Sequence, residues 1–148
     1  MNLDDLDWQL LELLQTDGRL TFSELGRRVS LSAPAVTERV RRLEEKGVIT
    51  GYSADVDLTK LGLPIEAMVR AKVRSLDTAR FRETILALPQ VLDADHVTGD
   101  ECWLVRVTCR NTAELEELVE RMQRYGETTT SLVFSSPARR RAVVRPRG

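Results

Sequence analysis

The sequence lacks the excess of positive charge that would mark a whole surface as a binding site for nucleic acid. Its 22 lysine and arginine residues are balanced by 23 aspartate and glutamate residues, so the formal net charge is −1. Any nucleic-acid binding must therefore rest on a local basic patch. With 148 residues, of which 42% are hydrophobic and 30% charged, the chain suits one medium domain or two small ones, each with a packed core.

Long apolar runs and a secretory leader are also missing. No run approaches the roughly 18 residues of a membrane span, so we expect no association with a membrane. The first residues are acidic at Asp4, Asp5 and Asp7, whereas a signal peptide begins with positive charge. The cysteines, Cys102 and Cys109, would point to opposite faces of one strand, which argues against a mutual disulfide. These features predict a reduced, cytoplasmic protein.

Residues for catalysis or metal binding are scarce. The single histidine, His96, has no obvious nucleophile to activate, and the sequence shows no Ser/His/Asp set. His96, Cys102 and Cys109 do not follow the spacing of a zinc site. We therefore expect no catalytic residue, no metal and no cofactor. A structural histidine and buried thiols are the favoured interpretation, and redox sensing through Cys102 is the alternative.

The first 52 residues have the pattern of three helices and a β-like segment. Thr21 and Glu24 have capping-box spacing at the start of the second helix. Ser32 can cap the third helix, which stops at Gly47, and residues 48–52 are β-like. The apolar residues of the first helix recur at helical spacing: Leu6, Leu10, Leu13 and Leu14. This order is typical of a winged helix-turn-helix domain.

The third helix divides into an apolar back and a polar, basic front. Val36, Val40 and Leu43 form the buried stripe. Small residues at the start of the helix allow close approach to DNA, and arginines can bond guanine edges or hold phosphates. Arg39 falls on the flank. The predicted DNA-binding residues are Ser32, Ala33, Pro34, Ala35, Thr37, Glu38, Arg39, Arg41 and Arg42. The alternative is a solvated amphipathic helix in a three-helix bundle.

Beyond a connector at residues 53–64, strands and helices alternate. We expect strands at 65–73, 91–97, 102–109 and 128–136, with helices at 77–88 and 112–124. The order βαββαβ predicts a ferredoxin-like unit, and hence an α+β protein. We expect a DNA-binding domain at 1–52, a linker at 53–64, and a second domain at 65–148 that includes a basic tail. The tail arginines are Arg139, Arg140, Arg141, Arg145 and Arg147. They could touch DNA phosphates or serve only to keep the tail soluble.

Specific runs of residues resemble the Lrp/AsnC (feast/famine) family of transcription regulators. The similar segments are Leu6-Asp7, residues 13–19, and residues 31–52 with their Arg-Val-x-x-Leu-Glu-x-x-Gly-Val-Ile run. The resemblance covers nearly the whole chain, because the βαββαβ half matches the second domain of that family. It implies a sequence-specific regulator that binds double-stranded DNA.

The same resemblance implies an effector site in the second domain, for an amino acid or a related small molecule. The family has a Thr-Gly-x-x-Asp pattern at the hairpin between the middle strands, and this sequence has Thr98-Gly99-Asp100-Glu101-Cys102. Cys102 therefore stands where the usual acidic residue would be. The predicted effector-binding residues are Thr98, Gly99, Asp100, Glu101, Tyr125, Thr128, Thr129 and Thr130. Without a ligand, they would be an ordinary turn and a β-prone threonine run.

The family resemblance also implies a homodimer that assembles further, to an octamer. One face of the predicted sheet carries a mixture of charged and apolar residues that a second copy could cover: Met68, Arg70, Lys72, Asp93, Asp95, Leu104 and Arg106. Two rival functions remain. The first is an architectural protein that compacts DNA without sensing an effector. The second is an enzyme built on the ferredoxin-like unit, which the missing acid/base pair disfavours.

Overall fold

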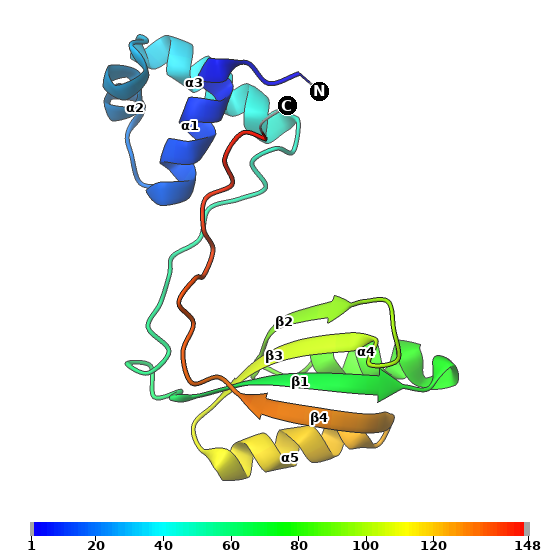
Figure 1. The fold of residues 1–148 in the computed structure, drawn as a ribbon. Coiled ribbons are helices and arrows are strands. Elements are labelled where there is room, and N and C mark those ends of the chain that lie inside the picture. Colours follow the sequence, from blue (N-terminus) through cyan, green and yellow to red (C-terminus); the bar gives the residue numbers. More distant parts are fainter. Residues whose placement is uncertain (1, 147–148) are drawn as a thin grey trace. The chain divides into compact units, whose positions relative to one another are not determined.

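The chain forms two compact units, shown in the computed structural model of Figure 1, which describes residues 2–146. The first unit contains the described residues up to Asp55 together with those from Pro137 onward. The second unit is Val56–Ser136. The chain therefore passes between the units twice. We expected the basic tail to group with the second domain, but its contacts group it with the first unit.

The first unit is built on three helices: α1 (Asp5–Thr16), α2 (Phe22–Val29) and α3 (Ala33–Glu45). Each begins with a side chain that accepts a backbone hydrogen bond: Asp4 from Asp7, Thr21 from Glu24 and Ser32 from Ala35. The predicted capping box of the second helix is thereby confirmed. The helices enclose a small core of Leu10, Leu25, Val29, Val36 and Val40.

The segment that follows α3 corrects one prediction. Gly47, at φ +66°, ends the helix, as expected. The β-like residues 48–52, however, form no strand, and α3 is followed by β1 in the described chain. Instead, the N–H groups of Val48 and Ile49 both donate to the carbonyl of Leu43, at 2.9 and 3.2 Å. A strand requires a neighbour for its backbone hydrogen bonds, and the described residues provide none here.

The tail lies against the end of α1. The side-chain amide of Gln15 donates to the carbonyl of Val143 at 3.1 Å and accepts from the N–H of Val143 at 2.8 Å. Arg140 pairs with Asp55 at 2.8 Å. Arg145 also pairs with an aspartate at the start of α1, Asp5. Arg140 and Arg145 are thus engaged by acidic groups of the first unit.

The second unit has the predicted βαββαβ order, and its four strands form one antiparallel sheet in the order β2-β3-β1-β4. The strands are β1 (Ile65–Val73), β2 (Val91–His96), β3 (Trp103–Cys109) and β4 (Gly126–Leu132). The helices are the short η1 (Ser75–Asp77), α4 (Thr78–Leu86) and α5 (Thr112–Gln123). The ferredoxin-like prediction is confirmed. The largest error is in the last strand, which we expected at 128–136.

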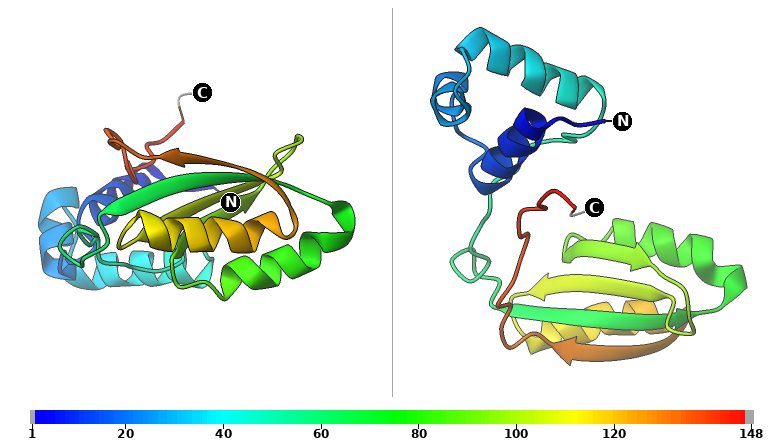
Figure 2. Two further views of the ribbon diagram at one scale, coloured as in Figure 1. Left: turned by 90° about the horizontal axis from the view of Figure 1, so that it is seen from below. Right: turned by 45° about the horizontal axis from the view of Figure 1, so that its top comes forward.

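The two faces of the sheet differ. Helices α4 and α5 cover one face (Figure 2), and a core lies beneath them that includes Val69, Phe81, Val105 and Met122. The other face carries Met68, Arg70 and Lys72 of β1, which the register places beside Arg106 and Leu104 of β3. The described residues contain no helix with the length and apolar character needed to cross a bilayer.

Candidate DNA interface and effector region

A close backbone approach fixes the turn between α2 and α3. Ser30 adopts a left-handed conformation at φ +57°, and the N–H of Leu31 donates to the carbonyl of Gly26 at 2.9 Å. A Cβ atom on Gly26 would lie only 2.5 Å from the carbonyl oxygen of Leu31. Glycine is therefore required at this position, because it lets the chain leave α2 and enter α3 within a few residues.

Most of the predicted DNA-binding residues lie at the start of α3 or along one exposed side of it. Of these residues, Ser32, Pro34, Thr37, Glu38, Arg41 and Arg42 are exposed, whereas Ala33, Ala35 and Arg39 are intermediate. Val36, Val40 and Leu43 are buried, as predicted. The apolar back and the polar front of the helix are therefore separated as the periodicity indicates.

Arg41 lies in the middle of this exposed side and, of the residues that the structure describes, pairs only with neighbours on its own helix. Its guanidinium lies 3.1 Å from the carboxylate of Glu38 and 3.4 Å from that of Glu45. The hydrogen bond to Glu38 raises the pKa of Arg41, so the side chain stays charged. Exposed pairs of this kind contribute little free energy. Arg41 can therefore exchange them for contacts to phosphates or bases.

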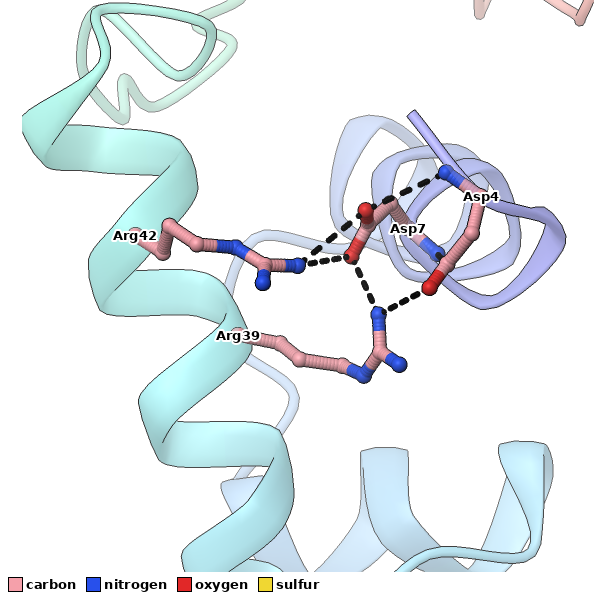
Figure 3. Close-up of polar contacts among 4 residues, drawn as sticks. All are labelled: Asp4, Asp7, Arg39 and Arg42. Carbon is pink, nitrogen blue, oxygen red and sulfur yellow. Dashed lines mark hydrogen bonds and ion pairs between the residues drawn. The ribbon is translucent and has the colours of Figure 1, made fainter. Parts of the chain in front are cut away.

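Arg39 and Arg42 instead turn toward α1 (Figure 3). Arg39 donates to Asp4 and to Asp7, at 2.7 Å each. Arg42 donates to Asp7 at 3.2 Å. The hydrogen bonds to Asp4 and Asp7 raise the pKa of Arg39. The sequence pattern missed this network, because helical periodicity assigns a face to a residue but not a partner on another helix.

A second contact holds the segment after α3. The hydroxyl of Tyr52 donates to the carboxylate of Glu44 at 2.8 Å. Burial, followed by this hydrogen bond, raises the pKa of Tyr52 to about 12. The phenol therefore remains a donor at neutral pH. The contact fixes the segment after α3 to an exposed residue of the candidate DNA-binding helix.

The hairpin between β2 and β3 folds over the open face of the sheet. Gly99 has φ +109°, a conformation that suits glycine. Asp100 lies 3.4 Å from the ammonium of Lys72, and Glu101 lies 3.7 Å from the guanidinium of Arg70. Glu101 also accepts from the hydroxyl of Thr129 at 3.1 Å. The structure thus brings the hairpin acids together with one of the predicted threonines.

Of the remaining predicted effector residues, Thr98 is exposed in the hairpin, whereas Tyr125, Thr128 and Thr130 lie on the side of the sheet that the helices cover. Thr128 lies opposite Ala71, and Thr130 lies opposite Val69, both of which are buried beneath the helices. Directly opposed residues in antiparallel strands share a face. The hydroxyl of Tyr125 meets that of Thr84 at 2.8 Å, and its ring packs edge-on against Phe81. The predicted set is therefore divided between the two faces of the sheet within one chain.

The thiols and the histidine form no metal centre. Among residues 2–146, no group of three or more His, Cys, Asp or Glu side chains could hold a metal ion. His96 stacks on Trp103 with ring centroids 4.6 Å apart. Cys109 is buried, and burial raises the pKa of its thiol. Cys102 is half-buried and packs against the edge of the core.

A helix-turn-helix unit with an exposed basic helix, followed by a ferredoxin-like domain, defines a class of two-domain DNA-binding transcription regulators. Residues 3–44 match the AsnC-type helix-turn-helix domain, and residues 66–143 match the Lrp/AsnC ligand binding domain. The chain belongs to the Lrp/AsnC family. It is therefore a DNA-binding transcriptional regulator with a ligand-binding domain, and its relatives are named as regulators rather than enzymes.

Individual relatives share both halves of the chain. The HTH-type transcriptional regulator LrpC of Bacillus subtilis is 38% identical over 135 residues, which cover 91% of this chain and 94% of LrpC. The solved structure of LrpC matches with a TM-score of 0.88 at 37% identity, covering 93% of this chain and 99% of that one. A complex of transcriptional regulator NMB0573 with L-Met, from Neisseria meningitidis, matches with a TM-score of 0.88 at 26% identity over 96% of each chain.

Proposed function

We propose that this regulator binds DNA sequence-specifically through the outward side of α3, and that a small effector of the amino-acid class changes its assembly or DNA affinity. The observation that carries the first part is the exposed, basic side of α3 opposite Val36, Val40 and Leu43. Arg41 is 60% exposed, which leaves it accessible to a duplex. Arginine reads guanine through two donors in the major groove and also neutralises phosphates.

The DNA-binding proposal is tested with Arg41→Ala combined with Arg42→Ala. We expect folding to be retained, because Arg41 pairs with exposed carboxylates and Arg39 still pairs with Asp7 when Arg42 is removed. We expect DNA binding to weaken greatly. Each lost phosphate contact flattens the dependence of log K on log salt by about one unit. The control is Arg80→Ala with Arg82→Ala, which removes the same charge from exposed positions of α4. Unchanged affinity and salt slope in the α3 variant would refute the proposed interface.

The effector proposal is supported by the polar hairpin and by the similar regulator solved with L-Met. Exposed hydroxyls, carboxylates and backbone groups can bond both ends of an amino acid. Cys102 at the position of the family's acidic residue leaves the choice of amino acid open. Binding should change DNA affinity or assembly by a coupling of about 1–3 kcal/mol.

The effector test begins with a thermal-shift screen of the amino acids at millimolar concentration. An active compound is then compared on wild-type protein, Gly99→Val and Gly62→Val. Both glycines have positive φ, at +109° and +79°, and neither would meet another atom within 4 Å on gaining a Cβ, so each substitution strains the backbone without a steric clash. We expect only Gly99→Val to lose the response while DNA binding persists. An undiminished response in Gly99→Val would show that the effector site lies elsewhere. If no amino acid binds the wild-type protein, the result favours an architectural protein that compacts DNA without sensing an effector.

We also propose a homodimer that assembles further, up to an octamer, through the open face of the sheet. Met68 and Leu104 are half-buried there, among ion pairs such as the 4.0 Å contact of Arg106 with Asp93. A second copy could cover the apolar groups and complete the pairing of the charges. Light scattering at micromolar protein should show a mass of at least a dimer. Leu104→Glu should reduce that mass, whereas Leu76→Glu, in η1, should not. A monomer for wild type would overturn this part.

A further inference from the structure

One carboxylate is taken out of solvent at the junction of α1 and α3. Among residues 2–146, Asp7 is the only buried carboxylate, with 3% of its surface exposed. A buried charge is tolerated only where it is paired and hydrogen-bonded. The partners of Asp7 are therefore required by its position, and its side-chain partners come from the helix that carries the candidate DNA-binding residues.

The bonds of Asp7 are directional. One oxygen, Oδ1, accepts from Nη1 of Arg39 at 2.7 Å. Both oxygens accept from Nη2 of Arg42, at 3.2 and 3.3 Å. The backbone N–H of Asp4 donates to Oδ2 at 3.3 Å. Figure 3 shows the two guanidinium groups reaching the carboxylate from successive turns of α3.

Arg39 and Arg42 differ in their exposure and in the number of N–H donors that remain unbonded. The side chain of Arg39 is 23% exposed and is shared between two aspartates, so it is largely committed to the fold. The side chain of Arg42 is 45% exposed and holds Asp7 through Nη2 alone. Its Nη1 and Nε have no hydrogen bond to any described residue, and both remain available as donors.

We propose that Asp7 is a positioning residue for DNA recognition: it fixes the guanidinium of Arg42 so that the remaining donors meet one site on the duplex. The inference rests on the proposed function, that this side of α3 reads DNA. A guanidinium held in one orientation has fewer alternative contacts, so it favours the sequence that matches that orientation. A released Arg42 can bond any nearby phosphate, which supports binding to all sequences equally.

The test compares two duplexes of equal length: one selected by the wild-type protein from a random pool, and one unrelated. Asp7→Asn keeps the shape of the side chain and removes its charge. We expect the ratio of the two affinities to fall by about tenfold, within the range of one arginine–guanine pair. Affinity for the unrelated duplex should stay the same or rise. The control, Glu12→Gln, removes the same charge from α1 about 140° around the helix from Asp7.

Two further variants distinguish positioning from a general effect on the fold. Arg42→Lys keeps the charge at an exposed site but loses the planar fork that can hold Asp7 and DNA together. Arg42→Lys should lower the ratio of the affinities for the selected and the unrelated duplex. The salt dependence of binding to the unrelated duplex should stay unchanged. In an Arg42→Ala background, Asp7→Asn should have no further effect on the ratio. Circular dichroism melting of each variant establishes that the folded protein is being assayed.

Several outcomes would overturn the inference. A folded Asp7→Asn with the wild-type ratio shows that Asp7 does not position Arg42. Equal losses on both duplexes show a structural role alone. If Asp7→Asn does not fold, Arg42→Lys decides, and an unchanged ratio there rejects the proposal. The failure of the proposed function gives a different result: Arg41→Ala with Arg42→Ala would then leave binding to both duplexes unaltered.

Discussion

Gly26→Ala should disrupt the geometry on which DNA recognition depends. An ideal Cβ at this position lies 2.5 Å from the carbonyl oxygen of Leu31 and 3.5 Å from its carbon. Both are backbone atoms of the turn, so the contact cannot be relieved by a side-chain rotation. The same turn holds the 2.9 Å hydrogen bond from Leu31 to Gly26 and the left-handed Ser30. The substitution must therefore move the start of α3 relative to α2.

Two effects of opposite sign determine how much Gly26→Ala changes the free energy of unfolding. Alanine is favoured over glycine inside a helix by about 1 kcal/mol. Overpacking of a tight interior costs about 1–3 kcal/mol, and weakening the turn hydrogen bond adds about 1 kcal/mol. We therefore expect a net loss of about 1–3 kcal/mol. For a loss of about 2 kcal/mol and a urea m-value of about 2 kcal/mol/M, the midpoint falls by about 1 M.

The assay is urea denaturation, followed by DNA binding under native conditions. Gly18→Ala is the matched control, because its Cβ would lie 3.4 Å from Tyr52 and 3.7 Å from the carbonyl of Leu14, which are ordinary contacts. We expect the control to shift the midpoint little and to bind DNA normally. A Gly26→Ala protein as stable as the control, with full DNA affinity, would refute the argument that close backbone approach sets the turn.

Three further predictions follow from single contacts. Hydrogen bonds from Gln90, then from Arg110, lower the pKa of Glu114 from 4.5 to about 2, so the stability that ionised Glu114 contributes is complete above pH 4.5 and is lost as the pH falls toward 2. Glu114→Gln should flatten the curve of stability against pH in that interval. An unchanged loss of stability at acid pH in this variant would contradict the prediction. A Cβ on Gly126 would lie 1.9 Å from the carbonyl oxygen of Lys72, so Gly126→Ala should destabilise the second unit by about 1–3 kcal/mol in urea denaturation, and wild-type stability would exclude that clash. Gln15→Ala removes both hydrogen bonds to the tail. Tryptic cleavage of residues 139–145 should become about fivefold faster, which is equivalent to ~1 kcal/mol. Equal cleavage rates in the variant and the wild type would show that the tail is held by other contacts.

The sequence was sufficient for the element order and for most of the core. Val36, Val40 and Leu43 are buried and Ile65–Val73 is a strand, because local periodicity decides such features. Gly126 would ordinarily be assigned to a turn, yet it starts β4 because only glycine fits against Lys72. The last strand therefore begins earlier than a β-propensity pattern predicts.

The features that the sequence did not reveal depend on partners that are distant in sequence. Residues 48–52 have β-propensity but no paired strand among residues 2–146, and propensity alone cannot supply one. Gln15 and Val143 are 128 residues apart, and no pattern in the basic tail indicates that contact. The predicted effector residues were grouped by resemblance, whereas strand register separates Thr129 from Thr128 and Thr130. Register depends on the pairing of whole strands and is not visible in a short threonine run.

The measurement that tests the central claim most directly is repeated selection of duplexes from a random pool by the wild-type protein, followed by sequencing. Sequence-specific reading by α3 predicts that one motif is enriched, and that a dimer produces two related half-sites in inverted order. Arg41→Ala with Arg42→Ala should lose that enrichment. A pool that stays random after successive rounds, although the protein binds DNA, would contradict sequence-specific recognition by this regulator.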